Sequence, residues 1–155
     1  MTYLQFLLVV HVLGAMIGFG STFAFAFFPA DADRLEPGVR TTLADISYKI
    51  GTRLSDPVVF LIQPLTGVLL IFETGRNHGF FDHQWLWIAI GLYLIFLSII
   101  VFVARPDTRH EYESTREGRT PDPNYRQRGN PTVYGPLLGA IIVVIVILMV
   151  WKPGD

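Results

Sequence analysis

The chain has 155 residues, of which 51% are apolar and only 16% charged, and its mean hydropathy is +0.43. Typical soluble domains carry about 25% charged residues and have much surface to cover with polar groups, so this composition argues against a small soluble domain. The net charge of -1 excludes a strongly basic nucleic-acid-binding protein, and the lack of cysteine excludes disulfides, thiol catalysis and cysteine-ligated metal centres.

Four apolar segments are long enough to cross a membrane as helices, because roughly 20 helical residues span a hydrocarbon core of about 30 Å. No Lys or Arg precedes the first segment, so we interpret it as a retained helix rather than a signal peptide. We therefore expect one all-α domain over residues 1–155, a four-helix transmembrane bundle. Its predicted helices are at about 3–28, 54–73, 85–104 and 133–151, and its predicted loops are at about 29–53 and 105–132.

The basic residues predict an orientation for this bundle. The two predicted loops carry all but Arg76 and Lys152 of the 12 lysines and arginines. The positive-inside rule places such loops in the cytoplasm and both termini on the other side. Aromatic residues that suit a membrane interface fall at that other side: Tyr3, Trp85, Trp87 and Trp151. We expect a multi-pass protein of a bacterial inner (plasma) membrane with both termini periplasmic.

The two predicted loops differ in pattern. In the first, Leu43, Ile46, Ile50 and Leu54 recur at spacings of three and four. This pattern predicts either a short amphipathic helix in the cytoplasmic interface or an extension of the second span kinked at Gly51. The stretch 107–130 is polar and has no periodicity, so we expect an extended loop that a partner could order.

Small residues on the predicted spans mark places where helices can approach closely. Most such residues pack helices within one bundle, and the others mediate association with another protein. The candidates are the pairs Gly14 and Gly18, and Gly135 and Gly139, with Gly67 and Gly91 as single contact points.

Gln63 and Pro64 lie in the middle of the second span. Proline removes one backbone hydrogen bond and frees a carbonyl one turn earlier, near Phe60, which Thr66 or a neighbouring helix could satisfy. The pattern predicts a helix kink that shapes the bundle. The alternative is a polar gate or a ligand contact through Gln63.

His11 is the one readily ionisable side chain of the first span, and ionisable residues inside a membrane suggest function. It shares a helical face with Gly14 and Gly18, so it is expected to point into the bundle. Three interpretations remain open: a neutral histidine hydrogen-bonded to a neighbouring helix, a haem or metal ligand, and a proton or quinone contact.

A haem or metal site would need a second ligand. His78 and His83 in the second hairpin and Met149 near the end of the fourth span are the candidates at a similar predicted depth. No motif places any of them beside His11.

Short motifs resemble a known bacterial family. They are His11–Ala15, Gln63–Gly67, Trp85 with Trp87, and Leu148–Pro153. This pattern is similar to the predicted integral membrane proteins of domain-of-unknown-function family 2269, and the resemblance implies four helices without an established reaction. A fainter likeness extends to copper-resistance protein D and to HemJ-type membrane proteins, which carry a histidine near the start of their first helix. The HemJ likeness implies haem at His11, although the Lys and Arg residues expected in a HemJ-like site are missing.

Three functions follow as hypotheses. The absence of phosphate-binding, zinc-protease and nucleophile motifs favours a non-enzymatic scaffold or accessory subunit of a larger membrane complex. The alternatives are a redox protein that binds haem b through His11, and a copper-handling protein that uses His11, His78, His83 and Met149. The expected partners are the lipid bilayer and other membrane subunits, and no nucleic acid.

Overall fold

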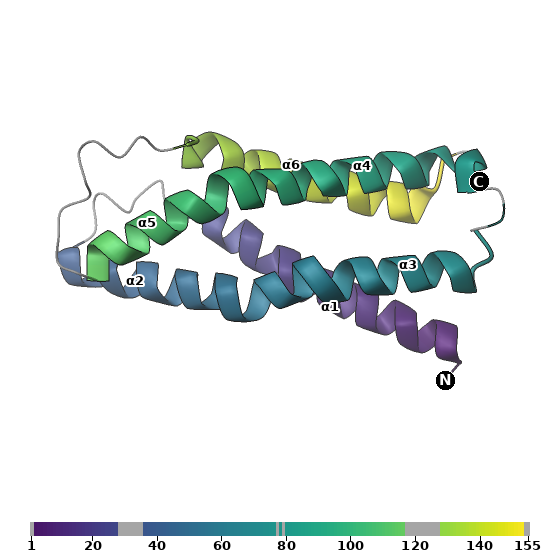
Figure 1. The fold of residues 1–155 in the computed structure, drawn as a ribbon, viewed down its shortest axis with the longest axis horizontal. Coiled ribbons are helices and arrows are strands. Elements are labelled where there is room, and N and C mark those ends of the chain that lie inside the picture. Colours follow the sequence, from purple (N-terminus) through teal and green to yellow (C-terminus); the bar gives the residue numbers. More distant parts are fainter. Residues whose placement is uncertain (1, 28–35, 77, 79, 117–127, 154–155) are drawn as a thin grey trace.

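The computed structural model describes residues 2–27, 36–76, 78, 80–116 and 128–153. Most of these residues lie in helices (Figure 1). The α-helices are α1 (Tyr3–Phe27), α2 (Pro37–Ile50), α3 (Gln63–Glu73), α4 (Gln84–Ile99), α5 (Arg105–Arg116) and α6 (Pro131–Trp151). Three π-helical turns and one 3-10 turn complete the described chain: Gly51–Ser55, Val58–Ile62, Ile100–Ala104 and Phe80–Asp82.

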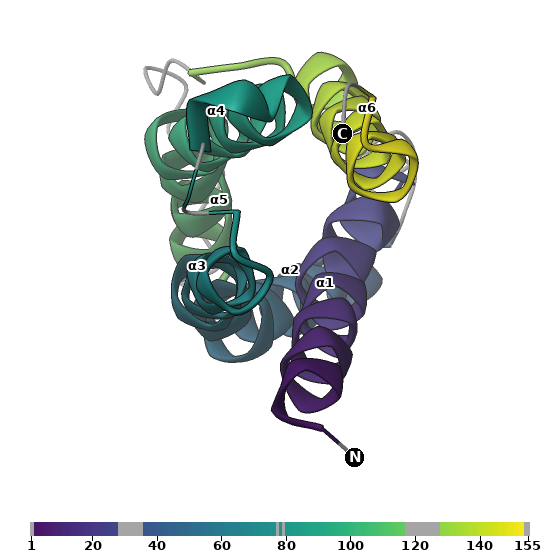
Figure 2. The same cartoon turned by 90° about the vertical axis from the view of Figure 1, so that its right-hand side faces the viewer.

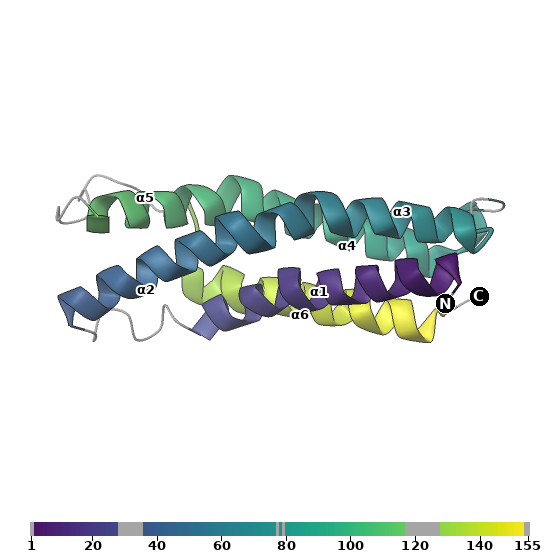
Figure 3. The same ribbon diagram turned by 90° about the horizontal axis from the view of Figure 1, so that it is seen from below.

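Four helical segments are long and apolar enough to cross a membrane. They are Tyr3–Ser21, Thr41–Glu73, Gln84–Ser114 and Val133–Trp151. The predicted all-α architecture with four spans is therefore confirmed. Both termini lie at the same end of the bundle, and α2 and α5 extend from the opposite end (Figures 1 and 3).

The spans surround a small apolar core, with α1 packed against α3 and α6, and α4 packed against α6 (Figure 2). Phe96 is fully buried, and the ring of Phe19 meets it edge-on at 5.4 Å between centroids. Only 17% to 33% of each span's most apolar window is buried, so most apolar side chains face outward. Helices that are apolar on every face suit lipid and not water as their surroundings. The other buried side chains of the cluster around Phe96 are Val59, Leu138, Ile141, Ile142 and Ile145.

The first predicted loop is largely helical where the structure describes it. α2 continues through the π-helical turn at Gly51 into α3, so the chain is helical from Pro37 to Glu73. Gly51 keeps a right-handed helical backbone, with φ -55° and ψ -58°. Of the two alternatives, the structure shows the extension of the second span, and residues 29–35 of the expected loop lie outside the described residues.

The expectation of an extended loop over 107–130 is wrong for its first part, because α5 continues α4 as a helix to Arg116. Two contacts explain why this polar stretch is helical. Arg109 and Glu113 form an i,i+4 ion pair at 2.8 Å, and Tyr112 stacks on Tyr48 of α2 at 4.1 Å between ring centroids. Residues 117–127 lie outside the described part of the chain.

Each π-helical turn directly precedes a proline in these long helices. Asp56, Gln63 and Arg105 donate their backbone N–H to the carbonyl five residues earlier, and the next residue is a proline in each case. A proline ring clashes with the carbonyl four residues back, and a wider turn relieves that clash. The turn before Pro64 lies at the site of the predicted kink.

Candidate functional site

His11 lies in the interface between α1 and α3, where it is 8% exposed. Its Nδ1 is 2.8 Å from Thr66 Oγ1, and its Nε2 is 3.2 Å from Gln63 Nε2. α3 supplies both partners because residues 63 and 66 are three apart and so lie on one helical face. The structure thus brings together His11, Gln63 and Thr66 as one buried polar cluster, which we call the His11 cluster.

The hydrogen bonds of the His11 cluster, with the Gln63 amide oriented as in the structure, are those of a neutral imidazole. Thr66 Oγ1 donates to the carbonyl of Ile62 at 2.7 Å, so it accepts from His11 Nδ1–H. The other ring nitrogen, Nε2, then carries a lone pair and accepts from the Gln63 side-chain N–H. Every ring nitrogen of His11 is therefore used within the bundle.

Gly14 leaves space that the His11 cluster occupies, and Gly67 lies at ordinary contact distance from it. A Cβ at Gly14 would lie 2.9 Å from Gln63 Oε1, and one at Gly67 would lie 3.5 Å from His11 Cε1. Gln63 Oε1 is buried and has no hydrogen-bond partner among the described residues. The small residues beside His11 thus accommodate a glutamine and the imidazole itself.

This arrangement does not fit haem as it stands. Iron would bind a histidine nitrogen, and His11 Nε2 would first have to lose its hydrogen bond to Gln63. The room that a flat macrocycle would need beside Gly14 is filled by the Gln63 side chain. The geometry therefore supports a packing role for His11, through interhelical hydrogen bonds of the kind that associate membrane helices.

The other predicted ligands are not hydrogen-bond partners of His11 in the described structure. His78 is exposed, His83 is half-buried directly before α4, and Met149 is 38% exposed near the end of α6. Among the residues that the structure describes, no group of three or more His, Cys, Asp or Glu side chains could hold a metal ion. A metal site at His78 and His83 stays a prediction.

The predicted packing glycines occupy different surroundings. A Cβ at Gly18 would lie 2.7 Å from Val59 Cγ2, so α1 and the π-helical turn before α3 meet closely there. Gly135 and Gly139 are buried in α6, whereas a Cβ at Gly91 would have no neighbour within 4 Å.

Sequence reasoning missed Tyr93, which links α4 to the second span. Its hydroxyl donates to the carbonyl of Val59. Gln63 N–H, the usual donor to that carbonyl, bonds Val58 instead, and Pro64 has no N–H. Tyr93 therefore satisfies a carbonyl that the proline and its π-helical turn leave unpaired, and the signal in the sequence is a tyrosine in mid-span opposite a proline.

A second polar contact joins α1 to the π-helical turn at Gly51–Ser55, farther than His11 from the end of the bundle that holds both termini. The hydroxyls of Ser21 and Ser55 are hydrogen-bonded, and Ser21 also donates to the carbonyl of Gly18 at 3.0 Å. Val58 lies between this pair and the His11 cluster, in contact with Gly14 and Gly18. The two polar contacts are therefore separated by an apolar side chain and do not form one hydrogen-bonded path.

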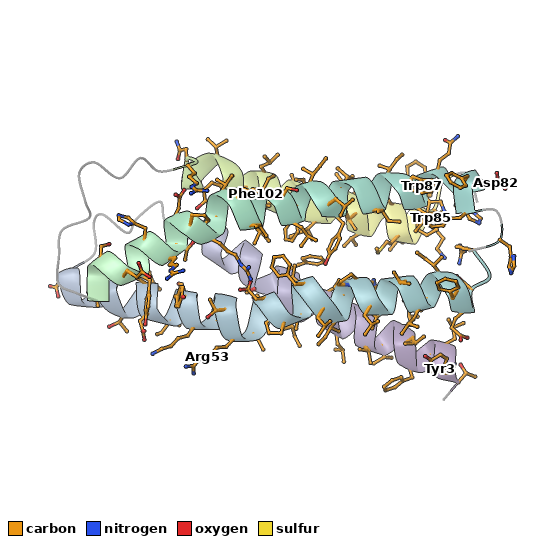
Figure 4. The ribbon with its side chains drawn as sticks, in the orientation of Figure 1. Tyr3, Arg53, Asp82, Trp85, Trp87 and Phe102 are labelled. Carbon is orange, nitrogen blue, oxygen red and sulfur yellow. The ribbon has the colours of Figure 1, made fainter. Side chains whose placement is uncertain are left out.

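An ion pair marks the end of the apolar region. Arg105 Nη2 is 2.5 Å from Asp56 Oδ2, and its guanidinium lies 4.4 Å from the ring centroid of Phe60. At the opposite end, beside both termini, lie Tyr3, Trp85 and Trp87 (Figure 4). Between Asp56 and Glu73 the chain has no charged residue. A helix over this stretch rises about 26 Å, close to the thickness of a hydrocarbon core.

Four apolar spans with aromatic residues at one end and an ion pair at the other define an integral membrane protein. Residues 5–153 match the model of the family described as "Predicted integral membrane protein (DUF2269)", and the chain belongs to this family. No curated protein and no solved structure matches the chain. The fainter likeness to copper-resistance protein D and HemJ-type proteins stays a prediction from the sequence.

Proposed function

We propose that this membrane protein is a non-catalytic scaffold or accessory subunit that binds another membrane protein through α2. The observation that carries the proposal is a row of exposed apolar side chains on a helix that is longer than the hydrocarbon core requires. The second span has 33 residues, although about 20 are enough to cross the hydrocarbon core. α2 precedes Asp56, so it lies outside the apolar region.

The apolar row consists of Val39, Ile46, Ile50 and Leu54, which are between 36% and 51% exposed. α2 also packs against α5, where Tyr48 stacks on Tyr112. The row is therefore left without a partner inside the described chain, and exposed apolar surface on a projecting helix is typical of an interaction site.

Charge favours a helix with acidic residues as the occupant of this row. Lys49 on α2 and Arg53 in the π-helical turn that follows are exposed beside it, and Lys49 already pairs with Asp45 at 2.5 Å. A second copy in a closed dimer would be related by an axis along the membrane normal. Its α2 would then lie parallel to the first, with Arg53 facing Arg53, so a different subunit with acidic side chains is the better complement.

Site-specific photo-crosslinking in cells tests this function. A photoreactive residue at Ile46 should give one discrete adduct with a membrane protein of different mass, and Arg53→Glu should reduce its yield severalfold because like charges then meet. The matched control is a photoreactive residue at Thr52, which borders the pocket between α2 and α5. Adducts of twice the chain mass, lipid adducts alone, or equal yields from both positions would contradict the proposal.

The orientation is part of the same proposal. Among the described residues, the end that carries α2 and α5 holds most of the basic residues, and the end with both termini holds Arg76 and Lys152. The positive-inside rule supports a cytoplasmic α2 and α5, with both termini on the periplasmic side of a bacterial inner membrane.

A further inference from the structure

A pocket of about 500 Å³ opens between α2 and α5, at the end of the apolar region. Figures 1 and 3 show these two helices side by side at the end of the bundle opposite to both termini. Tyr48, Thr52 and Asp56 line one wall of the pocket, and Arg105, Arg109 and Arg128 line the other. Because Arg105 and Asp56 mark the end of the apolar region, the pocket lies at the depth of lipid headgroups.

The arginines of this pocket differ in how they are neutralised. Arg105 pairs with Asp56 at 2.5 Å, and Arg109 pairs with Glu113 at 2.8 Å. Within the described chain, the guanidinium of Arg128 forms no ion pair, and its Nη1 donates only to the carbonyl of Phe102 at 3.4 Å. The side chains that line the pocket therefore carry three positive charges against the two negative charges of Asp56 and Glu113, and Arg128 is the arginine without an ion pair in the described chain.

The backbone holds Arg128 at the pocket. Asp107, which is 6% exposed, accepts the N–H of Arg128 at 3.1 Å and that of Gly129 at 3.2 Å. A Cβ at Gly129 would lie 2.5 Å from Val103 Cγ1, so only glycine lets this segment approach the end of the third span so closely. The backbone at Arg128 is thus held beside the pocket by a buried carboxylate and a close contact at Gly129.

We propose that this pocket binds a phosphate group, and that the phosphate belongs to an anionic phospholipid in the surrounding leaflet. A guanidinium presents a planar set of donors that matches phosphate oxygens, and the Arg128 donors are largely unused. Phe102 precedes Arg105 by three residues, toward the apolar part of the third span. Its side chain is exposed and can contact an acyl chain (Figure 4). Free phosphate shares the headgroup chemistry, so the test must separate the two sources.

Native mass spectrometry of the full chain with phosphatidylglycerol tests the site. Arg128→Gln should reduce lipid adducts by about fivefold more than Arg53→Gln, since one cation near a membrane surface contributes about that factor. Arg53→Gln removes the same charge from the π-helical turn after α2, and Arg53 lies outside this pocket. Arg128→Lys should fall between wild type and Arg128→Gln because it keeps the charge and loses the planar set of donors.

The competing source is tested in the same samples with millimolar inorganic phosphate. If phosphate does not displace the lipid, the ligand is the phospholipid headgroup. If phosphate raises the melting temperature of wild type but not of Arg128→Gln, while lipid adducts respond equally to both glutamine variants, the site takes free phosphate. Equal lipid loss in Arg128→Gln and Arg53→Gln, without any Arg128-dependent effect of phosphate, would overturn the proposal.

Discussion

Gly18→Leu is expected to lower the free energy of unfolding by about 3 kcal/mol, at the upper end of the usual cost of overpacking. A Cβ at Gly18 would lie 2.7 Å from Val59 Cγ2 and 3.3 Å from Val58 Cγ1. Both valines are buried, at 3% and 7% exposed, so neither side chain has room to move away. The leucine must therefore separate α1 from the helix that leads into α3. Reversible unfolding in mixed micelles, followed by circular dichroism, measures the change.

Gly20→Leu is the matched control, because it introduces the same side chain two residues further along α1. A Cβ at Gly20 would have no neighbour within 4 Å, and the residue is exposed. We expect this variant to stay within about 0.5 kcal/mol of wild type, as surface substitutions usually do. Equal destabilisation by both leucines would show that α1 does not pack against the second span through Gly18.

His11→Ala is expected to cost about 2 kcal/mol, because it removes two buried hydrogen bonds and leaves unfilled volume between α1 and α3. The lipid-facing Val12→Ala, at a residue that is 49% exposed, serves as a control for the loss of side-chain volume. Since hydrogen bonds between membrane helices are worth about 0.6 kcal/mol on average, most of the cost reflects packing and unpaired partners.

A double-mutant cycle isolates the contact between His11 and Gln63. The combined variant His11→Ala with Gln63→Leu should be about 1 kcal/mol more stable than the sum of the single changes predicts, because the glutamine amide no longer lacks its partner. Strict additivity would show that the two side chains do not interact in the folded bundle. A single change at His11 without effect on stability would contradict its packing role.

The spans were predictable because long apolar segments have one stable solution in lipid, in which each helix satisfies its own backbone. The burial of His11 against another helix was among the sequence alternatives. The partners of His11 could not be predicted, because the pairing depends on how α1 and α3 align in the structure. Gln63 and Thr66 were each noted for other reasons, and only the packed structure places both beside the imidazole.

The features that the sequence did not predict depend on contacts between segments that are distant in the sequence. α5 is polar and lacks apolar periodicity, and its helix is supported by the stacking of Tyr112 on Tyr48, more than sixty residues away in the sequence. Tyr93 on the Val59 carbonyl depends on a π-helical turn, which the sequence indicates only as a proline. Local patterns predicted the helices well and their partners poorly.

Accessibility of single cysteines tests the central claim most directly, because the natural chain has no cysteine to interfere. Thr2→Cys and Lys152→Cys place a thiol near each terminus, and Thr42→Cys and Thr108→Cys place one on α2 and α5 (Figure 3). In intact cells a membrane-impermeant maleimide should label both terminal thiols, and the other two only after the membrane is opened. Labelling of Thr2→Cys and Lys152→Cys from opposite sides, or of all four without opening the membrane, would contradict a bundle of four spans.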